Sequence, residues 1–336
     1  GGGRPVPRMG NKHEDERMKR RDVLRFLGTG AALAAGYGVA SWLDGVVPLG
    51  RPGRMLSETR LGMGTYVSLS VVDPSQSRAE EALGAAWAVL DRLEARLTRF
   101  RPESALSALN SHGRLDGAPE DLTRVLDLAV FAHRATKGAF DPTVLPVLAY
   151  IEESAEAGRR PDPSRLEELR GLVGLERVRW DGRSVHLDRA GMALTLDGVA
   201  KGYIVDRMAE ALRERGVRHG LVDAGGDIAA FGGKAEGLPW MVAVRNPADV
   251  ESPLARLELT DGACATSGDY EVYFDKERLF HHIVDPATGV SPHLIHSSTV
   301  LADTAARADS LATALLVLGP WGEDVIRPHV SRVILA

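Results

Sequence analysis

Two periodic patterns alternate along this chain and limit what it can fold into. Short segments that are apolar, or that alternate between apolar and polar residues as at 58–72 and 254–259, predict strands at 58–72, 192–196, 220–228, 240–247, 254–259, 298–302 and 330–335, with a hairpin at 178–187. Segments with an apolar stripe at helical spacing predict helices at 77–98, 120–136, 197–215 and 305–318. This mixture favours an α+β (mixed α/β) fold over a doubly wound parallel sheet.

Composition excludes several functional classes. The 336 residues carry a net charge of −5 and few aromatic residues, so neither a basic face nor a stacking surface supports nucleic-acid binding. A single cysteine, Cys264, rules out disulfides within the chain and cysteine-based zinc sites. Cys264 lies among small apolar residues, which favours a buried thiol over a nucleophile.

The first 47 residues do not resemble the rest of the chain. A basic group ending in Arg20 and Arg21 precedes an apolar, small-residue segment over 23–47. This order predicts a twin-arginine-like export signal or an N-terminal anchor, with a frayed amphipathic helix as the alternative. We therefore expect a linker at 48–55, a catalytic or binding domain at 56–336, and a location in the periplasm or on the outer face of the membrane.

The stretches Ala265–Phe274 and His281–Gly289 are too polar and too rich in small residues to serve only as core. They contain hydroxyls, acids, two adjacent histidines and a Pro/Gly turn. We interpret them as a strand that leads into a loop facing a ligand.

A glycine-rich junction at 197–203 opens a predicted helix. Free backbone N–H groups and the positive helix end suit a phosphate there, and Lys201 adds a positive charge. The glycine spacing matches neither a Walker loop nor a dinucleotide fingerprint.

An acid and a hydroxyl share one face of the apolar helix at 305–318. Asp309 and Thr313 are four residues apart and costly to bury without partners, which a hard cation such as Mg2+ would supply. Alternatively, Thr313 bonds within its own helix and Asp309 pairs with a lysine or arginine.

At two turn positions the sequence allows either a ligand contact or a purely structural role. Gly62 and Gly64 flank Met63, where the backbone either approaches a ligand or forms a bulge at the start of a strand. Asp141 before Pro142 is either a cap or a ligand contact.

Eight motifs in order resemble the ApbE family of FAD:protein FMN transferases over residues 59–318. They are Met-Gly-Thr at 63–65, Phe-Arg-Pro-Glu-Ser at 100–104, Gly-Ala-Phe-Asp-Pro-Thr at 138–143, Gly-Val-Ala-Lys-Gly-Tyr at 198–203, Asp-Ala-Gly-Gly-Asp at 223–227, Ala-Thr-Ser-Gly-Asp-Tyr-Glu at 265–271, His-His-Ile-Val-Asp-Pro-Ala-Thr-Gly at 281–289 and Ala-Asp-Ser-Leu-Ala-Thr-Ala at 308–314. The resemblance implies largely antiparallel sheets flanked by helices.

The same resemblance implies a chemistry. An enzyme of this kind uses Mg2+ and cleaves the pyrophosphate of FAD. It passes FMN to a threonine or serine hydroxyl of an acceptor protein, such as a subunit of a membrane redox complex, and releases AMP. Carried over by position, the FAD contacts are Met63, Phe100, Ala139, Phe140, Asp141, Lys201 and Ile283, and the metal ligands are Gly198, Asp309, Ala312 and Thr313.

Of the adjacent histidines, His282 is the candidate base for the incoming hydroxyl, with a satisfied loop histidine as the alternative. His281 points the other way if the segment is extended.

Two departures from the family pattern stand out. Where the family commonly has Asp-Leu-Gly-Gly, this chain has Thr195-Leu-Asp197-Gly198, so Thr195 and Asp197 both remain candidate flavin contacts. Phe100 replaces a common tyrosine, which keeps ring stacking but loses a hydroxyl. Two alternatives to the transferase therefore stay open, an FAD pyrophosphatase that releases FMN and AMP and a non-catalytic flavin-binding protein.

Overall fold

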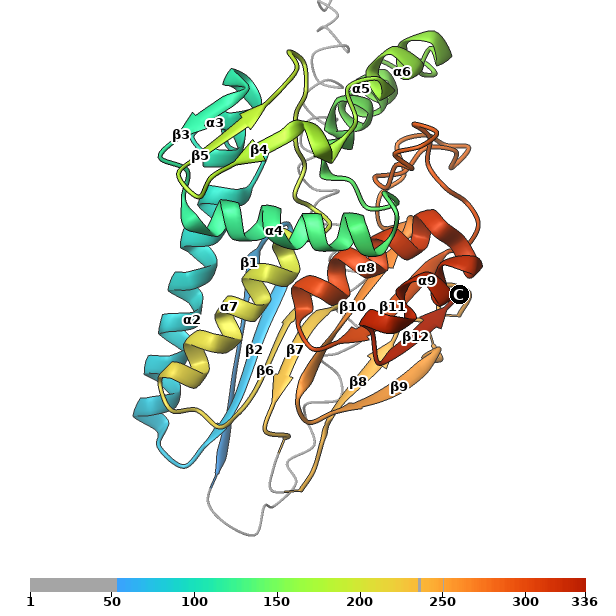
Figure 1. Ribbon diagram of the computed structural model, residues 1–336. Coiled ribbons are helices and arrows are strands. Elements are labelled where there is room, and N and C mark those ends of the chain that lie inside the picture. Colours follow the sequence, from blue (N-terminus) through green and yellow to red (C-terminus); the bar gives the residue numbers. More distant parts are fainter. Residues whose placement is uncertain (1–52, 235–236, 250) are drawn as a thin grey trace, which may run out of the picture.

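The computed structural model describes residues 53–234, 237–249 and 251–336 (Figure 1). The predicted export segment at 1–47 lies outside the described residues. Within the described part, no helix is both long enough and apolar enough to cross a membrane.

Most predicted elements are present. The strands are β1 Arg54–Gly62, β2 Thr65–Asp73, β3 Arg114–Asp116, β4 Val178–Trp180, β5 Ser184–Leu187, β6 His219–Ala224, β7 Asp227–Phe231, β8 Trp240–Val244, β9 Ala255–Leu259, β10 Gly262–Gly268, β11 Ser297–Ala302 and β12 Arg332–Leu335. The α-helices are α2 Gln76–Leu97, α3 Ala105–His112, α4 Glu120–Ala135, α5 Leu145–Glu156, α6 Pro163–Arg170, α7 Ala200–Glu214, α8 Ala305–Leu318 and α9 Gly322–Ile326.

A seven-stranded sheet with the order β1-β2-β6-β7-β10-β11-β12 forms the centre of the molecule. Every neighbouring pair in it is antiparallel, which confirms the α+β expectation. Small sheets β3-β5-β4 and β8-β9 accompany it.

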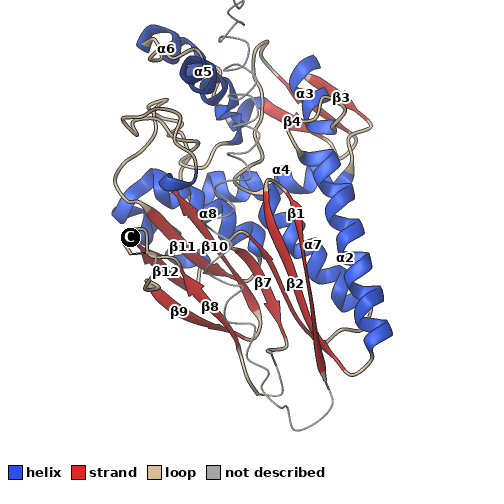
Figure 2. Ribbon diagram, turned by 180° about the vertical axis from the view of Figure 1, so that it is seen from behind, coloured by secondary structure: helices blue, strands red, loops and turns tan. Residues whose placement is uncertain are grey.

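Both faces of this sheet are covered (Figures 1 and 2). Helices α2, α7 and α8 lie on one face, where Val67, Leu69 and Ala229 join the main core. The β8–β9 ribbon lies on the other, where Trp240 packs in one cluster with Ile228 and Cys264. The strands are therefore apolar on both sides, and Cys264 is buried as expected.

Two strand predictions were wrong. The segment 58–72 is a hairpin because Met63 and Gly64 both adopt positive φ, +52° and +72°, as a type I′ turn requires; Gly62 pairs with Thr65 and is not a bulge. The segment 192–196 is not a strand, because the side chain of Asn110 bonds the N–H and C=O of Leu194 in place of a neighbouring strand.

Helices α7 and α8 cap each other's first turns. Asp309 of α8 accepts a hydrogen bond from the Gly202 amide (3.0 Å), and Asp206 of α7 accepts from the amides of Ala305 (2.8 Å) and Ala306 (2.9 Å). These carboxylates satisfy N–H groups that a helix leaves free at its start, and they favour the positive end of its dipole.

This double cap requires the two backbones to be very close. A Cβ built on Gly202 would lie 2.4 Å from the carbonyl oxygen of Ala305, so only glycine fits.

We expect Gly202→Ala to lower the free energy of unfolding by roughly 1–3 kcal/mol, because backbone atoms must shift to admit the methyl group. Gly84→Ala, in the middle of α2 with open space around it, is the matched control and should stabilise by about 0.5–1 kcal/mol. Urea unfolding of both variants measures this. A Gly202→Ala protein as stable as the parent would contradict the close approach.

Candidate active site

Lys201 on the first turn of α7 is the positive centre of the candidate site. Its Nζ lies 3.2 Å from Oδ2 of Asp227, which follows the glycine turn between β6 and β7. The Lys201 side chain is 24% exposed and that of Asp227 only 2%, so the acid is shielded from solvent while part of the lysine side chain is not. The start of α7 therefore combines the positive end of a helix dipole with a cation, which suits a phosphate.

Negative charge exceeds positive charge around this lysine. Burial opposes ionisation of Lys201, but Asp227, Glu271 and Asp309 outweigh it and hold the lysine pKa above its ordinary value. Burial raises the pKa of Asp227 to about 6 and that of Glu271 above its ordinary range. Burial, followed by the charge of Asp227, raises the pKa of Asp309 well above its ordinary value. One lysine thus faces two buried acids, Asp227 and Asp309, and the partly exposed Glu271.

The turn between β6 and β7 is shaped by its glycines. Gly225 and Gly226 adopt φ of +66° and +102°, and Asp223 accepts a hydrogen bond from the Gly226 amide (2.9 Å). A Cβ on Gly225 would meet Oγ1 of Thr65 at 2.5 Å, so the β1–β2 turn with Met63 lies close to this turn.

The candidate metal ligands gather where α8 meets the start of α7. A Cβ on Gly198 would lie 3.0 Å from Oγ1 of Thr313 and 3.2 Å from the ring of Phe140. Thr313 Oγ1 is 3.3 Å from Oγ of Ser267 on β10. The Ala312 carbonyl accepts from Ser298 (2.7 Å).

These oxygens fit a hard divalent cation. Asp309, Thr313 and the neighbouring backbone carbonyls are oxygen donors, and the excess of buried acids supplies negative charge for a cation to neutralise. Within the described part of the chain, no three carboxylate, histidine or cysteine side chains form a metal site by themselves. Mg2+, which keeps waters and substrate phosphates as ligands, does not need such a cluster.

The two adjacent histidines have different surroundings. His281 is fully buried; its Nε2 bonds the Pro292 carbonyl (2.7 Å) and its Nδ1 accepts from the Ile283 amide (3.3 Å). His282 Nδ1 is buried without a hydrogen-bond partner among the described residues, and its Nε2 lies 4.0 Å from Glu271. Of the two histidines, only His282 has a ring nitrogen without a hydrogen-bond partner among the described residues. This agrees with the opposite orientations expected for adjacent residues.

His282 is a neutral imidazole at physiological pH. Burial, assisted by the charge of Lys201, lowers its pKa to about 4. A neutral imidazole can accept a proton.

Other carried-over residues contact the protein itself. Asp141 caps the turn at 142–144 by accepting from the Thr143 amide (2.8 Å), and it also accepts from the Leu175 amide (3.1 Å), so it acts as a cap. Thr195 Oγ1 accepts from the Asp197 amide (3.2 Å). Ile283 is buried, and Ala139 packs against the main core.

Phe100 and Asp197 sit together beside Arg99. The Phe100 ring is 69% exposed, with the Arg99 guanidinium 4.2 Å from its centroid. Asp197 Oδ2 accepts from Arg99 Nε (2.8 Å). Asp197, the acid that stands two positions away from the aspartate common in the family, is therefore bound by Arg99.

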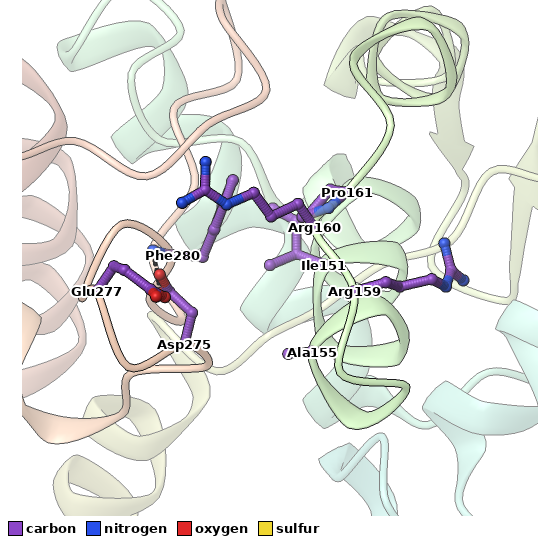
Figure 3. A pocket seen from close by; sticks show the side chains of 8 residues that line it. All are labelled: Ile151, Ala155, Arg159, Arg160, Pro161, Asp275, Glu277 and Phe280. Carbon is purple, nitrogen blue, oxygen red and sulfur yellow. Dashed lines mark hydrogen bonds between the residues drawn. The ribbon is translucent and has the colours of Figure 1, made fainter.

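Two hollows lie along α5. One of about 330 Å³ is bordered by Arg99, α3, the start of α5 and residues 191–193. The other, of about 30 Å³, lies between α5 and the loop at 275–280, where Arg160 extends toward Phe280 and Glu277 (Figure 3). Phe280 packs against α5, so this contact ties the loop that carries His282 to that helix.

Comparison with known proteins identifies the family. The model of the ApbE family matches residues 63–333. This chain belongs to the ApbE family. A Haemophilus influenzae protein named FAD:protein FMN transferase is 31% identical over 281 residues, which cover 79% of this chain and 81% of the relative. A Vibrio cholerae protein of the same name is 33% identical over 242 residues, covering 69% and 71%.

A solved structure supports the same assignment. The ApbE protein of Thermotoga maritima superimposes with a TM-score of 0.77 at 28% identity, covering 84% of this chain and 94% of that one. The fold expected from the resemblance is thus confirmed for this ApbE member.

Sequence reasoning missed three residues of the site. Asp227 and Glu271 lie within the family motifs but were not singled out; the positive charge of Lys201 should have prompted a search for carboxylate partners among those motifs. Nothing local marks Arg99, because its partners Glu152 and Asp197 are 53 and 98 residues away.

We expect NMR titration of the His282 ring to show a midpoint near 4, so that the imidazole stays neutral down to about pH 5. In urea the same ring should titrate near its ordinary value of about 6.5, because burial is lost. A folded-state midpoint near 6.5 would contradict the buried environment.

Proposed function

We propose that this chain is a Mg2+-dependent FAD:protein FMN transferase that attaches FMN to a threonine or serine hydroxyl of an acceptor protein. The observation that carries the proposal is the Lys201 site, where a helix start, a lysine and a set of oxygen donors converge. Family membership and the names of the curated relatives support it.

The chain's own residues can perform each step. Lys201 and the positive end of the α7 dipole attract the pyrophosphate, and the exposed Phe100 ring offers a surface on which a ring of FAD can stack. The acceptor oxygen attacks the phosphorus on the FMN side. The bond to the bridging oxygen breaks, and AMP leaves with the electron pair.

Proton transfer accompanies the attack. The neutral ring of His282 takes the hydroxyl proton, and Glu271, 4.0 Å from Nε2, stabilises the imidazolium. Mg2+, held by Asp309 and Thr313 with the backbone oxygen of Gly198, would supply stabilisation of the charge that develops on phosphate oxygens; the Ala312 carbonyl is already occupied by Ser298.

We also propose that the enzyme acts outside the cytoplasm. The support is the twin-arginine-like segment ending near residue 47, and the partners that fit are exported acceptors such as subunits of membrane redox complexes.

Incubation of the protein with FAD, Mg2+ and a threonine-containing acceptor peptide tests the activity. Mass spectrometry should show the peptide with one FMN attached and an equal amount of AMP. Free FMN and AMP without adduct would indicate a pyrophosphatase instead, and unchanged FAD would indicate a flavin-binding protein.

The variant His282→Ala tests the proposed general base in the same assay. It should bind FAD with little change and form adduct at least about 100-fold more slowly, which is the usual contribution of a general base. Loss of FAD binding would instead assign His282 a structural role.

Two substitutions of Asp309 separate its role as a charged metal ligand from its role as a cap of helix α7. Asp309→Asn keeps an oxygen to accept from Gly202 and should unfold near the parent temperature, yet lose Mg2+-dependent turnover. Asp309→Ala removes both functions and should also lose roughly 1–2 kcal/mol of stability. Activity and thermal unfolding are measured on both variants; unaltered turnover in either would overturn the metal assignment.

A further inference from the structure

The Phe100 ring is exposed, yet the chain around it is held in place. The Phe100 amide donates to Oγ1 of Thr98 (3.2 Å), Ser104 Oγ donates to the Thr98 carbonyl (2.6 Å), and Ser107 Oγ donates to the Arg99 carbonyl (3.3 Å). The backbone that carries this exposed ring is therefore fixed, so the ring is presented to solvent from an ordered segment.

The Arg99 guanidinium is fixed on every nitrogen. Nε donates to Asp197 (2.8 Å), while its two terminal nitrogens donate to the two carboxylate oxygens of Glu152 (2.8 and 3.3 Å). The Arg99 side chain is only 13% exposed. This planar group therefore cannot rotate, and the Phe100 ring lies on it with 4.2 Å between Cζ and the ring centroid.

We propose that Arg99 is a positioning residue, which fixes the Phe100 ring as a stacking surface for a ring of FAD and holds Asp197 away from the diphosphate. The inference rests on the proposed function. It assigns roles to Arg99, Glu152 and Asp197 that are separate from the phosphate and metal contacts at Lys201 and Asp309.

Charge balance supports this assignment. Asp197 is half exposed and close enough to His282 to influence its ring electrostatically. Left unpaired, this carboxylate would repel a diphosphate. Arg99 offsets part of this charge, because Glu152 shares the same guanidinium, and the hydrogen bond holds Asp197 Oδ2 on the arginine.

A double-mutant cycle tests the proposal. Arg99→Gln combined with Asp197→Asn removes the pair without changing net charge; Phe100→Ala removes the ring; a triple variant combines all three. The affinity for FAD, with Mg2+ and without acceptor, is followed by quenching of flavin fluorescence. Thermal unfolding checks that each variant is folded.

If Arg99 acts through Phe100, the effects will not add. The pair variant should bind FAD roughly 3–10-fold more weakly, Phe100→Ala about tenfold more weakly, and the triple variant no more weakly than Phe100→Ala. A triple variant weakened by the product of the two effects, or a pair variant that binds like the parent, would overturn the role of Arg99.

Two single substitutions complete the test. Arg99→Lys keeps the charge but lacks the planar fork, so it should still bind FAD several-fold more weakly; parent affinity would overturn the proposal. Arg124→Gln removes an exposed arginine–carboxylate pair on α4 and should leave affinity unchanged.

Measurements on the parent protein distinguish failure of the Arg99 proposal from failure of the proposed function. FAD binding and adduct formation by the parent, together with additive losses in the cycle, would overturn the Arg99 proposal alone. A parent that does not bind FAD would overturn the proposed function and the Arg99 proposal together.

Discussion

The hydrogen bond from the Gly202 amide to the Asp309 carboxylate joins α8 to the first turn of α7, and the candidate site depends on it. It places an acid of one helix beside the lysine of the other, and it satisfies an N–H group that α7 leaves free. Asp206 forms the converse bonds to the start of α8. Because the bonds run in both directions, the two helices cannot slide past each other without losing both caps.

Charge imbalance follows from this geometry. Lys201 faces the buried Asp227 and Asp309 together with the partly exposed Glu271, and a single ammonium group cannot neutralise several acids. A protein retains such a costly arrangement where a ligand completes it. A divalent cation and a diphosphate together restore the balance, with the cation against the acids and the diphosphate against Lys201 and the helix start.

The local sequence pattern predicted the helices and strands better than it predicted which distant residues contact one another. Helix α8 begins and ends at the predicted residues, since apolar spacing is written in its own sequence, and the same spacing placed Asp309 and Thr313 on one face. The hairpin at Met63 was missed because a non-glycine residue adopts positive φ there. The Lys201–Asp227 and Arg99–Asp197 pairs join residues 26 and 98 positions apart, and only the folded chain reveals them.

Anomalous diffraction from crystals soaked with Mn2+ and FAD tests the central claim most directly, because Mn2+ replaces Mg2+ at oxygen sites and can be located independently of the protein. The account predicts one strong peak at about 2.0–2.3 Å from oxygens of Asp309 and Thr313, with the pyrophosphate between the cation and Lys201. A peak elsewhere, or a pyrophosphate bound away from Lys201, would contradict it.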